Sequence, residues 1–166
     1  MFREMRRKNQ VLSTEENIQI LNRGTSGVLA VSGDNHYPYA VPLSYVYYDN
    51  KIFFHCAKTG HKLDSIAGNE KVSFCVIDKD QVVPEEYTTY FRSVIIFGRA
   101  RILENEEEKR SALKILAEKY LPDHEQSALQ EIEKALSHVC IIELAVEHMT
   151  GKEAIELNKQ RHLQTD

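Results

Sequence analysis

The chain of 166 residues contains no tryptophan and only three cysteines. Cys56, Cys75 and Cys140 are odd in number and far apart, and no Cys-x-x-Cys pair occurs, so neither a disulfide framework nor a structural zinc site is indicated. No apolar run approaches the roughly 20 residues that span a bilayer. No apolar stretch near the start has the form of a signal peptide. We therefore expect a cytoplasmic protein that does not associate with membranes.

The chain also has no excess of positively charged residues. The chain has 21 Lys and Arg residues against 25 Asp and Glu, a formal net charge of -4 and a pI of about 6.0. Because a general nucleic-acid binder carries a basic footprint, no nucleic-acid partner is expected. The locally basic opening, MFREMRRKNQ, is interpreted as a solvated arm. Neither a Rossmann glycine fingerprint nor a Walker loop occurs in the sequence.

The length and composition predict one domain with a substantial core. Hydrophobic residues make up 42% of the chain and charged residues 28%, as is ordinary for a globular protein. No internal repeat, low-complexity tract or linker divides the sequence. We expect a single domain over 1–166, with a core at about 5–150 and a polar, weakly patterned tail at 151–166.

Short runs of β-branched and aromatic residues fill the middle of the chain and are typical of strands. They are separated by turn signals such as GDN and DNK, and they lie at 25–33, 39–50, 51–57, 71–78, 90–103 and 138–151. About six strands in consecutive hairpins suggest a closed antiparallel barrel. The segment 80–89, DQVVPEEYTT, is predicted to be a loop.

Capping signals and helical spacing predict helices before and after the strands. Ser13 and Glu16 have the spacing of a capping box ahead of a helix at about 14–23, which Gly24 can end. Further helices are predicted at 60–69, 105–120 and 123–136, the last with Asp123 as its cap.

Two residues predict irregularities within strands. Pro42 donates no ladder hydrogen bond, so its position should be a sheet edge, a bulge or a site left open for a ligand. Gly98 indicates a bulge or bend in the run at 90–103.

The segment FFHCAKTGHKLDSI concentrates positive charge where a strand gives way to a helix. Lys58, His61 and Lys62 surround the predicted start of that helix, although the dipole there favours anions. Free backbone N–H groups at such an end, together with these cations, suggest a phosphate site. The alternative is that both lysines are solvated on a loop and balanced by nearby acidic residues.

His55 and Cys56 also permit a metal interpretation, with His61 as a third ligand. Zinc sites use tighter and more redundant spacing than this. Strand alternation also places His55 and Cys56 on opposite faces. We therefore expect no metal site.

Three segments in order, YPYAVPLSY, FHCAKTGHKLDSI and TTYFRSVIIFGRA, strongly resemble the flavin-binding split barrels related to pyridoxamine 5'-phosphate oxidase. The resemblance covers roughly residues 5–150 and is greatest to the branch of the Nim-type nitroimidazole resistance proteins. It implies a mainly β fold with flanking helices, in the form of a six-stranded antiparallel split β-barrel. It also implies a homodimer that holds flavin mononucleotide (FMN) in the groove between its subunits.

The resemblance further implies which residues contact the cofactor. The segment Val41–Ser44 would run along the flavin ring and its side chain, His61 and Lys62 would hold the phosphate, and the other positions would line the pocket. The implied cofactor-binding residues are Val41, Pro42, Leu43, Ser44, His55, Cys56, Ala57, His61, Lys62, Ser93 and Val94.

The chain departs from the true oxidases in two respects. His61 stands where they carry an arginine beside the lysine. The C-terminal signature of a tryptophan and arginines that holds pyridoxal phosphate is also missing, since the chain has no tryptophan. Vitamin B6 chemistry is therefore not expected.

The resemblance favours a flavin-dependent oxidoreductase that passes electrons to a small acceptor such as a nitro-aromatic. A flavin supplies its own hydride and electron chemistry, which accounts for the lack of an evident acid–base pair. His55 is the candidate catalytic residue, as a proton donor or an orienting group; alternatively, it only bonds the backbone or the cofactor. FMN is the expected cofactor, with FAD as the alternative because one phosphate site holds either.

Two other functions stay open. The first is a flavin-binding module without turnover, acting as a carrier or sensor. The second is haem binding, which occurs among relatives of this barrel, with an axial histidine as ligand. The candidate ligands are His36, His55, His124, His138 and His148.

Overall fold

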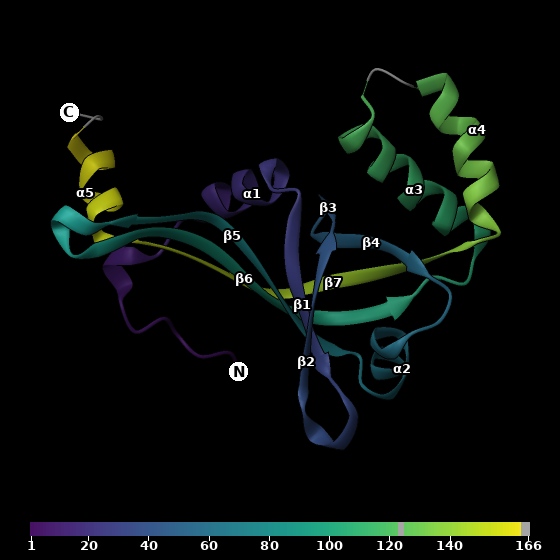
Figure 1. The fold of residues 1–166 in the computed structure, drawn as a ribbon, viewed down its shortest axis with the longest axis horizontal. Helices are drawn as coiled ribbons and strands as arrows, with labels where there is room; N and C mark the ends of the chain where they lie inside the picture. The colour runs from purple at the N-terminus through teal and green to yellow at the C-terminus, as the bar shows by residue number, and fades with distance from the viewer. Residues whose placement is uncertain (123–124, 164–166) are drawn as a thin grey trace.

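One antiparallel sheet forms the centre of the protein (Figure 1). The computed structural model describes residues 1–122 and 125–163, and within them the sheet has seven strands. The strands are β1 Ser26–Ser32, β2 Pro38–Ser44, β3 Val46–Tyr48, β4 Lys51–Ala57, β5 Lys71–Val83, β6 Thr88–Ile102 and β7 Val139–Glu153. The α-helices of the described residues are α1 Thr14–Arg23, α2 His61–Gly68, α3 Glu106–Tyr120, α4 Glu125–Leu136 and α5 Ile155–Leu163.

The sheet is a split barrel whose ladder does not close. Its strand order is β2-β1-β5-β6-β7-β4-β3, so β2 and β3 are the two edges. Tyr45 alone separates these edges in the chain, so they meet at this residue. The predicted split barrel is confirmed, but the number of strands is seven rather than six and the suggested closed barrel is wrong. The predicted strand at 39–50 is divided at Tyr45, which is fully buried.

The concave side of the sheet holds the main core. Alternation along β4 and β5 directs Phe54 and Phe74 into it, and Tyr45, between β2 and β3, is buried there as well. The ring of Phe74 meets the rings of Tyr45 and Phe54 edge to face, at centroid distances of 5.0 and 5.1 Å. Such pairs contribute about 0.5–1.5 kcal/mol each beyond the burial of their area.

A second, smaller core lies between helices α3 and α4 and the outer face of the sheet. Its buried members include Phe53, Leu113, Leu116 and Ile132. Phe53 and Phe54 are neighbours in the chain, so β4 contributes one aromatic ring to each core. This arrangement explains why the sequence of β4 is apolar without alternation.

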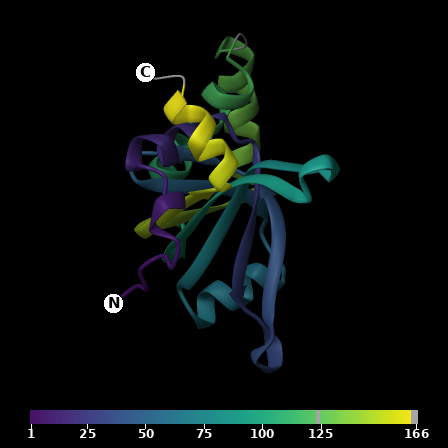
Figure 2. The ribbon, with the colours of Figure 1, turned by 90° about the vertical axis from the view of Figure 1, so that its left-hand side faces the viewer.

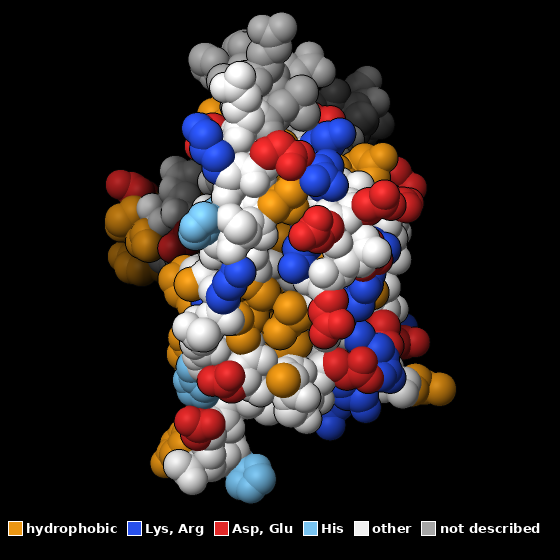
Figure 3. Space-filling view, turned by 90° about the vertical axis from the view of Figure 1, so that its right-hand side faces the viewer, with side chains coloured by type: hydrophobic (Ala, Val, Ile, Leu, Met, Phe, Trp, Pro, Cys, Tyr) orange, Lys and Arg blue, Asp and Glu red, His pale blue; other side chains and the backbone are white. Residues whose placement is uncertain are grey.

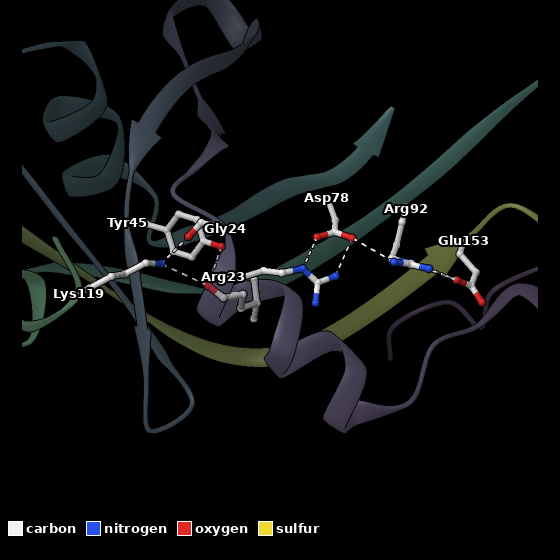
Figure 4. Close-up of polar contacts among 8 residues, drawn as sticks. Arg23, Gly24, Tyr45, Asp78, Arg92, Lys119 and Glu153 are labelled. Carbon is white, nitrogen blue, oxygen red and sulfur yellow. Dashed lines mark hydrogen bonds and ion pairs between the residues drawn. The ribbon is translucent and has the colours of Figure 1, made fainter. Parts of the chain in front are cut away.

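Helix α1 begins and ends as predicted. Ser13 and Glu16 form the capping box, with reciprocal side-chain to backbone hydrogen bonds of 3.2 and 2.7 Å. Lys119 of α3 donates a hydrogen bond to the carbonyl oxygen of Gly24, and its ammonium lies 4.4 Å from the ring centroid of Tyr45 (Figure 4). The end of α1 is therefore tied to both α3 and the sheet.

Strands β5 and β6 continue into a long hairpin, which projects from the body of the sheet (Figure 2). Their pairing extends to Val83 and Thr88, and the turn is a short 3-10 segment followed by Tyr87 at a φ of 51°. The predicted loop at 80–89 is therefore wrong for most of its length.

A row of ion pairs joins this hairpin to the segments beside it (Figure 4). Arg23 donates hydrogen bonds of 2.6 and 2.7 Å to Asp78. Arg92 lies 3.4 Å from Asp78 and donates bonds of 3.1 and 2.9 Å to Glu153, which is also in ion-pair contact with Arg161. Burial alone would raise the pKa of the Asp78 carboxyl, but the hydrogen bonds from Arg23 and Arg92 hold it below its ordinary value.

Residues 151–163 form regular structure where the sequence predicts a polar, weakly patterned tail. Strand β7 runs to Glu153, and α5 follows it with Ala154 and Leu157 buried at its start. Asp123, the predicted cap of the helix at 123–136, lies outside the described residues. None of the helices in the described ranges is long and apolar enough to cross a membrane.

Gly98 lies at a β-bulge, as predicted. The register between β6 and β7 shifts between Phe97 and Gly98. A Cβ atom at Gly98 would overlap the backbone carbonyl of Ala145 and the side chain of Leu144. The bulge therefore requires glycine, because there is no space for a side chain at this position.

We expect Gly98→Ala to lower the free energy of unfolding by about 3 kcal/mol, because backbone rather than a mobile side chain would have to shift. The melting temperature should fall by roughly 6–12 °C. Gly68→Ala is the matched control, because a Cβ at Gly68, the last residue of α2, meets no atom within 4 Å. Thermal unfolding of both variants checks the prediction, and equal melting temperatures would contradict it.

Candidate functional site

The predicted site residues of β2 and β4 are divided between the two faces of the sheet. Val41, Leu43 and Cys56 are half-buried and pack against the main core. The exposed residues, which belong to the outer face, are Pro42, Ser44, His55 and Ala57. A ligand on the outer face would meet the side chains of the second set only.

Pro42 lies on an edge strand, as one of its predicted alternatives requires. It pairs with Val28 of β1, and β2 is the first strand in the sheet order. The other side of β2 therefore has no ladder partner among the described strands, and its backbone is available to a ligand.

His55 and Cys56 point to opposite faces of β4, as alternation predicts. His55 is exposed, whereas Cys56 packs inward across from Cys140 of β7. Burial raises the pKa of the Cys56 thiol to about 11, and the nearby Lys62 ammonium opposes part of this shift. Among the described residues, no group of three or more His, Cys, Asp or Glu side chains is arranged to hold a metal ion.

The start of α2 is open, because no side chain caps it. Gly60 precedes the helix at a φ of 142°, a conformation that glycine adopts without strain. Its carbonyl oxygen accepts hydrogen bonds from the N–H groups of Leu63 and Asp64, which leaves the earlier N–H groups of this end for another acceptor. Lys62 is half-buried beside them.

His61 is held by the β1–β2 hairpin. Its ring stacks on that of Tyr39 at a centroid distance of 4.2 Å, and its Nε2 atom lies 3.9 Å from the Asp34 carboxylate. This nitrogen is buried and has no hydrogen-bond partner among the described residues. Of the two residues assigned to the phosphate, His61 is therefore fixed against the hairpin and offers one unsatisfied ring nitrogen.

Ser93 and Val94 occupy different environments. Val94 is fully buried in the main core, so its side chain is not available to a ligand. Ser93 is half-buried and lines a cavity of about 250 Å³ with Met5, Ile95 and Lys152. Ser44 and His55 line a different cavity, so one subunit does not bring Ser93 to them.

The cavity that contains Ser44 and His55 also involves residues that the sequence did not identify. These residues, such as Ala117 and Ala135, belong to α3 and α4. The helices α2, α3 and α4 lie on this side of the molecule, where hydrophobic side chains gather among charged ones (Figure 3). No local sequence signal predicts that α3 and α4 lie beside Ser44 and His55, because their position depends on how the helix pair packs on the sheet.

Comparisons with known proteins agree with this fold. Residues 13–153 match the family described as pyridoxamine 5'-phosphate oxidase. Among curated protein sequences, none matches the chain. The solved structures with the same fold include a candidate 5-nitroimidazole antibiotic resistance protein from Bacteroides thetaiotaomicron, which is 23% identical with a TM-score of 0.73 over 86% of each chain.

Two mycobacterial structures are also similar. The protein Rv2991 of Mycobacterium tuberculosis is 19% identical, with a TM-score of 0.78 over 90% of each chain. The FAD and haem binding protein of Mycobacterium smegmatis is 20% identical, with a TM-score of 0.74 over 89% of this chain and 74% of that one. At these identities the similarity is one of fold. Because the family match extends over most of the chain and agrees with the split barrel described above, the protein belongs to the pyridoxamine 5'-phosphate oxidase family.

Proposed function

We propose that the protein binds a flavin between two copies of the chain and uses it to reduce a small acceptor such as a nitro-aromatic compound. One observation carries the proposal. The exposed outer face at Ser44 and His55 is followed, at the end of β4, by an uncapped helix start with Lys62 beside it. The family membership supports a flavin site, as does the fold shared with the FAD and haem binding protein of M. smegmatis.

The residues at the start of α2 fit a flavin phosphate. That group carries between one and two negative charges, which free N–H groups and an ammonium both stabilise. Lys62 supplies the ammonium, and the unsatisfied Nε2 atom of His61 is a further candidate donor. We propose FMN as the cofactor, with FAD as the alternative.

The apolar outer face of the sheet supports the proposed homodimer. Val28, Ile77, Ile95 and Phe97 are exposed there, on strands β1, β5 and β6. A second copy that covered this apolar surface would remove it from water. It would also allow Ser93 of one subunit to approach a flavin held by the other, although the two cavities are separate within one chain. Dilution of the dimer should then release the flavin.

The flavin supplies electron transfer when it is bound. The chain's own residues bind it, orient the acceptor and move a proton. Ser44 and His55 face the same cavity, so both can contact a molecule bound there. The imidazole of His55 can donate a proton to an acceptor that has received electrons.

The absorption spectrum of the purified protein tests the proposal. A flavin band at about 450 nm is expected, and mass spectrometry of the released ligand should give FMN. A colourless protein that takes up neither FMN nor FAD would overturn the proposal. A yellow protein whose reduced form is not reoxidised by nitro compounds or quinones would instead indicate a carrier or sensor.

We expect His55→Ala to leave FMN affinity unchanged and to slow reoxidation of the reduced protein by a nitro-aromatic about 100-fold, the contribution typical of a positioned proton donor. Stopped-flow absorbance measures the rate. His36→Asn is the control, because His36 lies at the exposed hairpin tip at a φ of 65°, which asparagine tolerates. Equal rates in the wild type and His55→Ala would remove His55 from the mechanism.

Haem binding is a second candidate, favoured by the fold shared with the FAD and haem binding protein. The described histidines that could bind the haem iron differ in whether their rings already contact other residues. His148 stacks on Phe2 at a centroid distance of 4.6 Å, and His138 bonds the Ser137 hydroxyl at 2.6 Å. His36 and His55 are exposed, and His124 lies outside the described residues. A Soret band at about 400 nm after hemin is added would support this function.

A further inference from the structure

The sheet splits at Tyr45, between β2 and β3, and helix α3 supplies the hydrogen bonds at this point. The hydroxyl of Tyr120, the last residue of α3, accepts a 3.1 Å hydrogen bond from the N–H of Tyr45 and lies 2.6 Å from the carbonyl oxygen of the same residue. It also lies 2.8 Å from the carbonyl oxygen of Thr25, just before β1. One side chain therefore contacts both backbone groups of Tyr45 and the segment that leads into β1.

The hydroxyl occupies the place of a ladder pair that does not form. The register of β1 and β2 ends with Ser26 opposite Ser44, so the next pair would be Thr25 and Tyr45. The Tyr120 hydroxyl instead stands between the N–H of Tyr45 and the carbonyl oxygen of Thr25. The ladder of β1 and β2 therefore ends at Tyr120.

The missing pair is one that would exchange hydrogen bonds. In an antiparallel ladder every second pair does so. At the far end of β1 and β2 the N–H of Gly33 donates a 2.8 Å bond to the carbonyl of Tyr37, and Thr25 is an even number of residues from Gly33. The Tyr120 hydroxyl thus replaces a direct bond from Tyr45 to Thr25 with a bridge.

The surroundings of Tyr45 hold this junction in one geometry. The ring of Tyr45 is fully buried, and its hydroxyl donates a 2.9 Å bond to the carbonyl of Leu21. Lys119, next to Tyr120, donates a hydrogen bond to the carbonyl of Gly24, and its ammonium lies 4.4 Å from the centroid of the Tyr45 ring (Figure 4). The last turn of α3 is therefore fixed to the end of α1 by Lys119 and to the split of the sheet by Tyr120.

Ser44 depends on this junction directly. It is the last residue of β2, it is exposed, and it lines the cavity of the candidate site together with His55 and Tyr120. Because β2 is an edge strand, only β1 pairs with it among the described strands. The position of Ser44 is therefore set by its pairing with Ser26 and by the contact of Tyr120 with the next residue of the chain.

We propose that Tyr120 is a positioning residue of the candidate site. By bonding the backbone of Tyr45, its hydroxyl fixes the orientation in which the Ser44 side chain faces the cavity. The consequence for a bound flavin rests on the proposed function, which places the flavin beside Ser44. Without the hydroxyl, the backbone of Tyr45 loses its bridge to α3 and Ser44 loses its fixed direction.

Exchange of the Tyr45 amide hydrogen in the flavin-free protein, measured by NMR, tests the contact without any ligand. This amide should be protected in the wild type, because the Tyr120 hydroxyl accepts its hydrogen bond. In Tyr120→Phe, which keeps the ring and removes only the hydroxyl, it should exchange about tenfold faster. The amides of the β5–β6 ladder, away from the substitution, should exchange as they do in the wild type.

Titration of the apoprotein with FMN, followed by quenching of FMN fluorescence, tests whether the hydroxyl acts through Ser44. Ser44→Ala should weaken binding roughly three- to tenfold, the loss expected for one neutral hydrogen bond. Tyr120→Phe should weaken it by a similar factor. The double variant Ser44→Ala/Tyr120→Phe should bind no more weakly than Ser44→Ala, because the two residues contribute to one contact.

Lys119→Met is the matched control. It loosens the same turn of α3 but removes no hydrogen bond from the backbone of Tyr45. It should lower the melting temperature and leave FMN affinity unchanged. A loss of FMN affinity equal to that of Tyr120→Phe would show that any loosening of this turn weakens binding, and would remove the specific role of the hydroxyl.

Two further results would overturn the proposal. One is unchanged exchange of the Tyr45 amide in Tyr120→Phe. The other is multiplication of the two losses in the double variant, which would show that Tyr120 acts independently of Ser44. A wild type that takes up no FMN would contradict the proposed function, and the exchange of the Tyr45 amide would then decide this proposal alone.

Discussion

Replacing Lys62 with alanine is expected to weaken FMN binding roughly 10- to 150-fold, because a hydrogen bond to a charged group contributes about 1.5–3 kcal/mol. Lys62 is half-buried, so its ammonium is less screened by water than that of an exposed lysine. Its field already reaches the Cys56 thiol on the preceding strand, where it opposes the rise in pKa that burial causes. Quenching of FMN fluorescence during titration of apoprotein measures the affinity.

Two further lysines separate a local phosphate contact from a general effect of charge. Lys58 lies at the exposed connection between β4 and α2, and Lys114 is exposed on α3. Lys114→Ala should leave FMN affinity unchanged, and Lys58→Ala should weaken it by less than Lys62→Ala. If Lys62→Ala retains full FMN occupancy at dilute concentration, the phosphate assignment is wrong and the lysines are solvated residues of a loop.

Local signals predicted those features of the fold that depend on neighbouring residues in the chain. The capping box of Ser13 and Glu16 and the bulge at Gly98 were both found from sequence. The division of the predicted strand at Tyr45 was not. Its cause is long-range, because the Tyr45 ring enters the main core and its hydroxyl donates a 2.9 Å hydrogen bond to the carbonyl of Leu21. No pattern within 39–50 carries that information.

The hairpin of β5 and β6 was missed for a different reason. Asp80, Gln81 and Val82 are all exposed, so both faces of this part of β5 are open to water and alternation gives no signal. The pairing is specified by the partner strand and by the contact between Asp78 and Arg92 across it. The polar residues and Pro84 instead resembled a loop.

The candidate site was predicted in part by the same reasoning. Alternation correctly assigned His55 and Cys56 to opposite faces. The resemblance, however, named positions without saying which way their side chains point. The side chain of Val94 lies in the main core and is therefore not available to a ligand. Ala117 and Ala135 were not predicted at all, because their distance from His55 is decided by the packing of α3 and α4 on the sheet.

Glu153→Gln is expected to lower the free energy of unfolding by about 3 kcal/mol, because it removes a buried charge that faces both Arg92 and Arg161. Asp78, at 3.4 Å from Arg92, compensates the guanidinium only in part. Glu153 has no exposed surface and accepts two hydrogen bonds from Arg92, at 3.1 and 2.9 Å. The melting temperature should fall by roughly 6–12 °C. Glu147→Gln on the same strand is the control. Its partner Arg99, at 2.7 Å, is half exposed, so the loss should stay below about 1 kcal/mol.

The double variant Arg92→Met/Glu153→Leu identifies the cause of that loss. Its two substitutions remove both charges, while Asp78 keeps Arg23 and Arg161 keeps Glu16 as partners. If the instability of Glu153→Gln comes from the Arg92 guanidinium, which has then lost its shorter-range partner, the double variant should recover most of the lost free energy. If it is as unstable as the single variant, hydrogen bonding and packing around Glu153 hold β7 against the hairpin, and the charge of the pair is not what stabilises this end of the sheet.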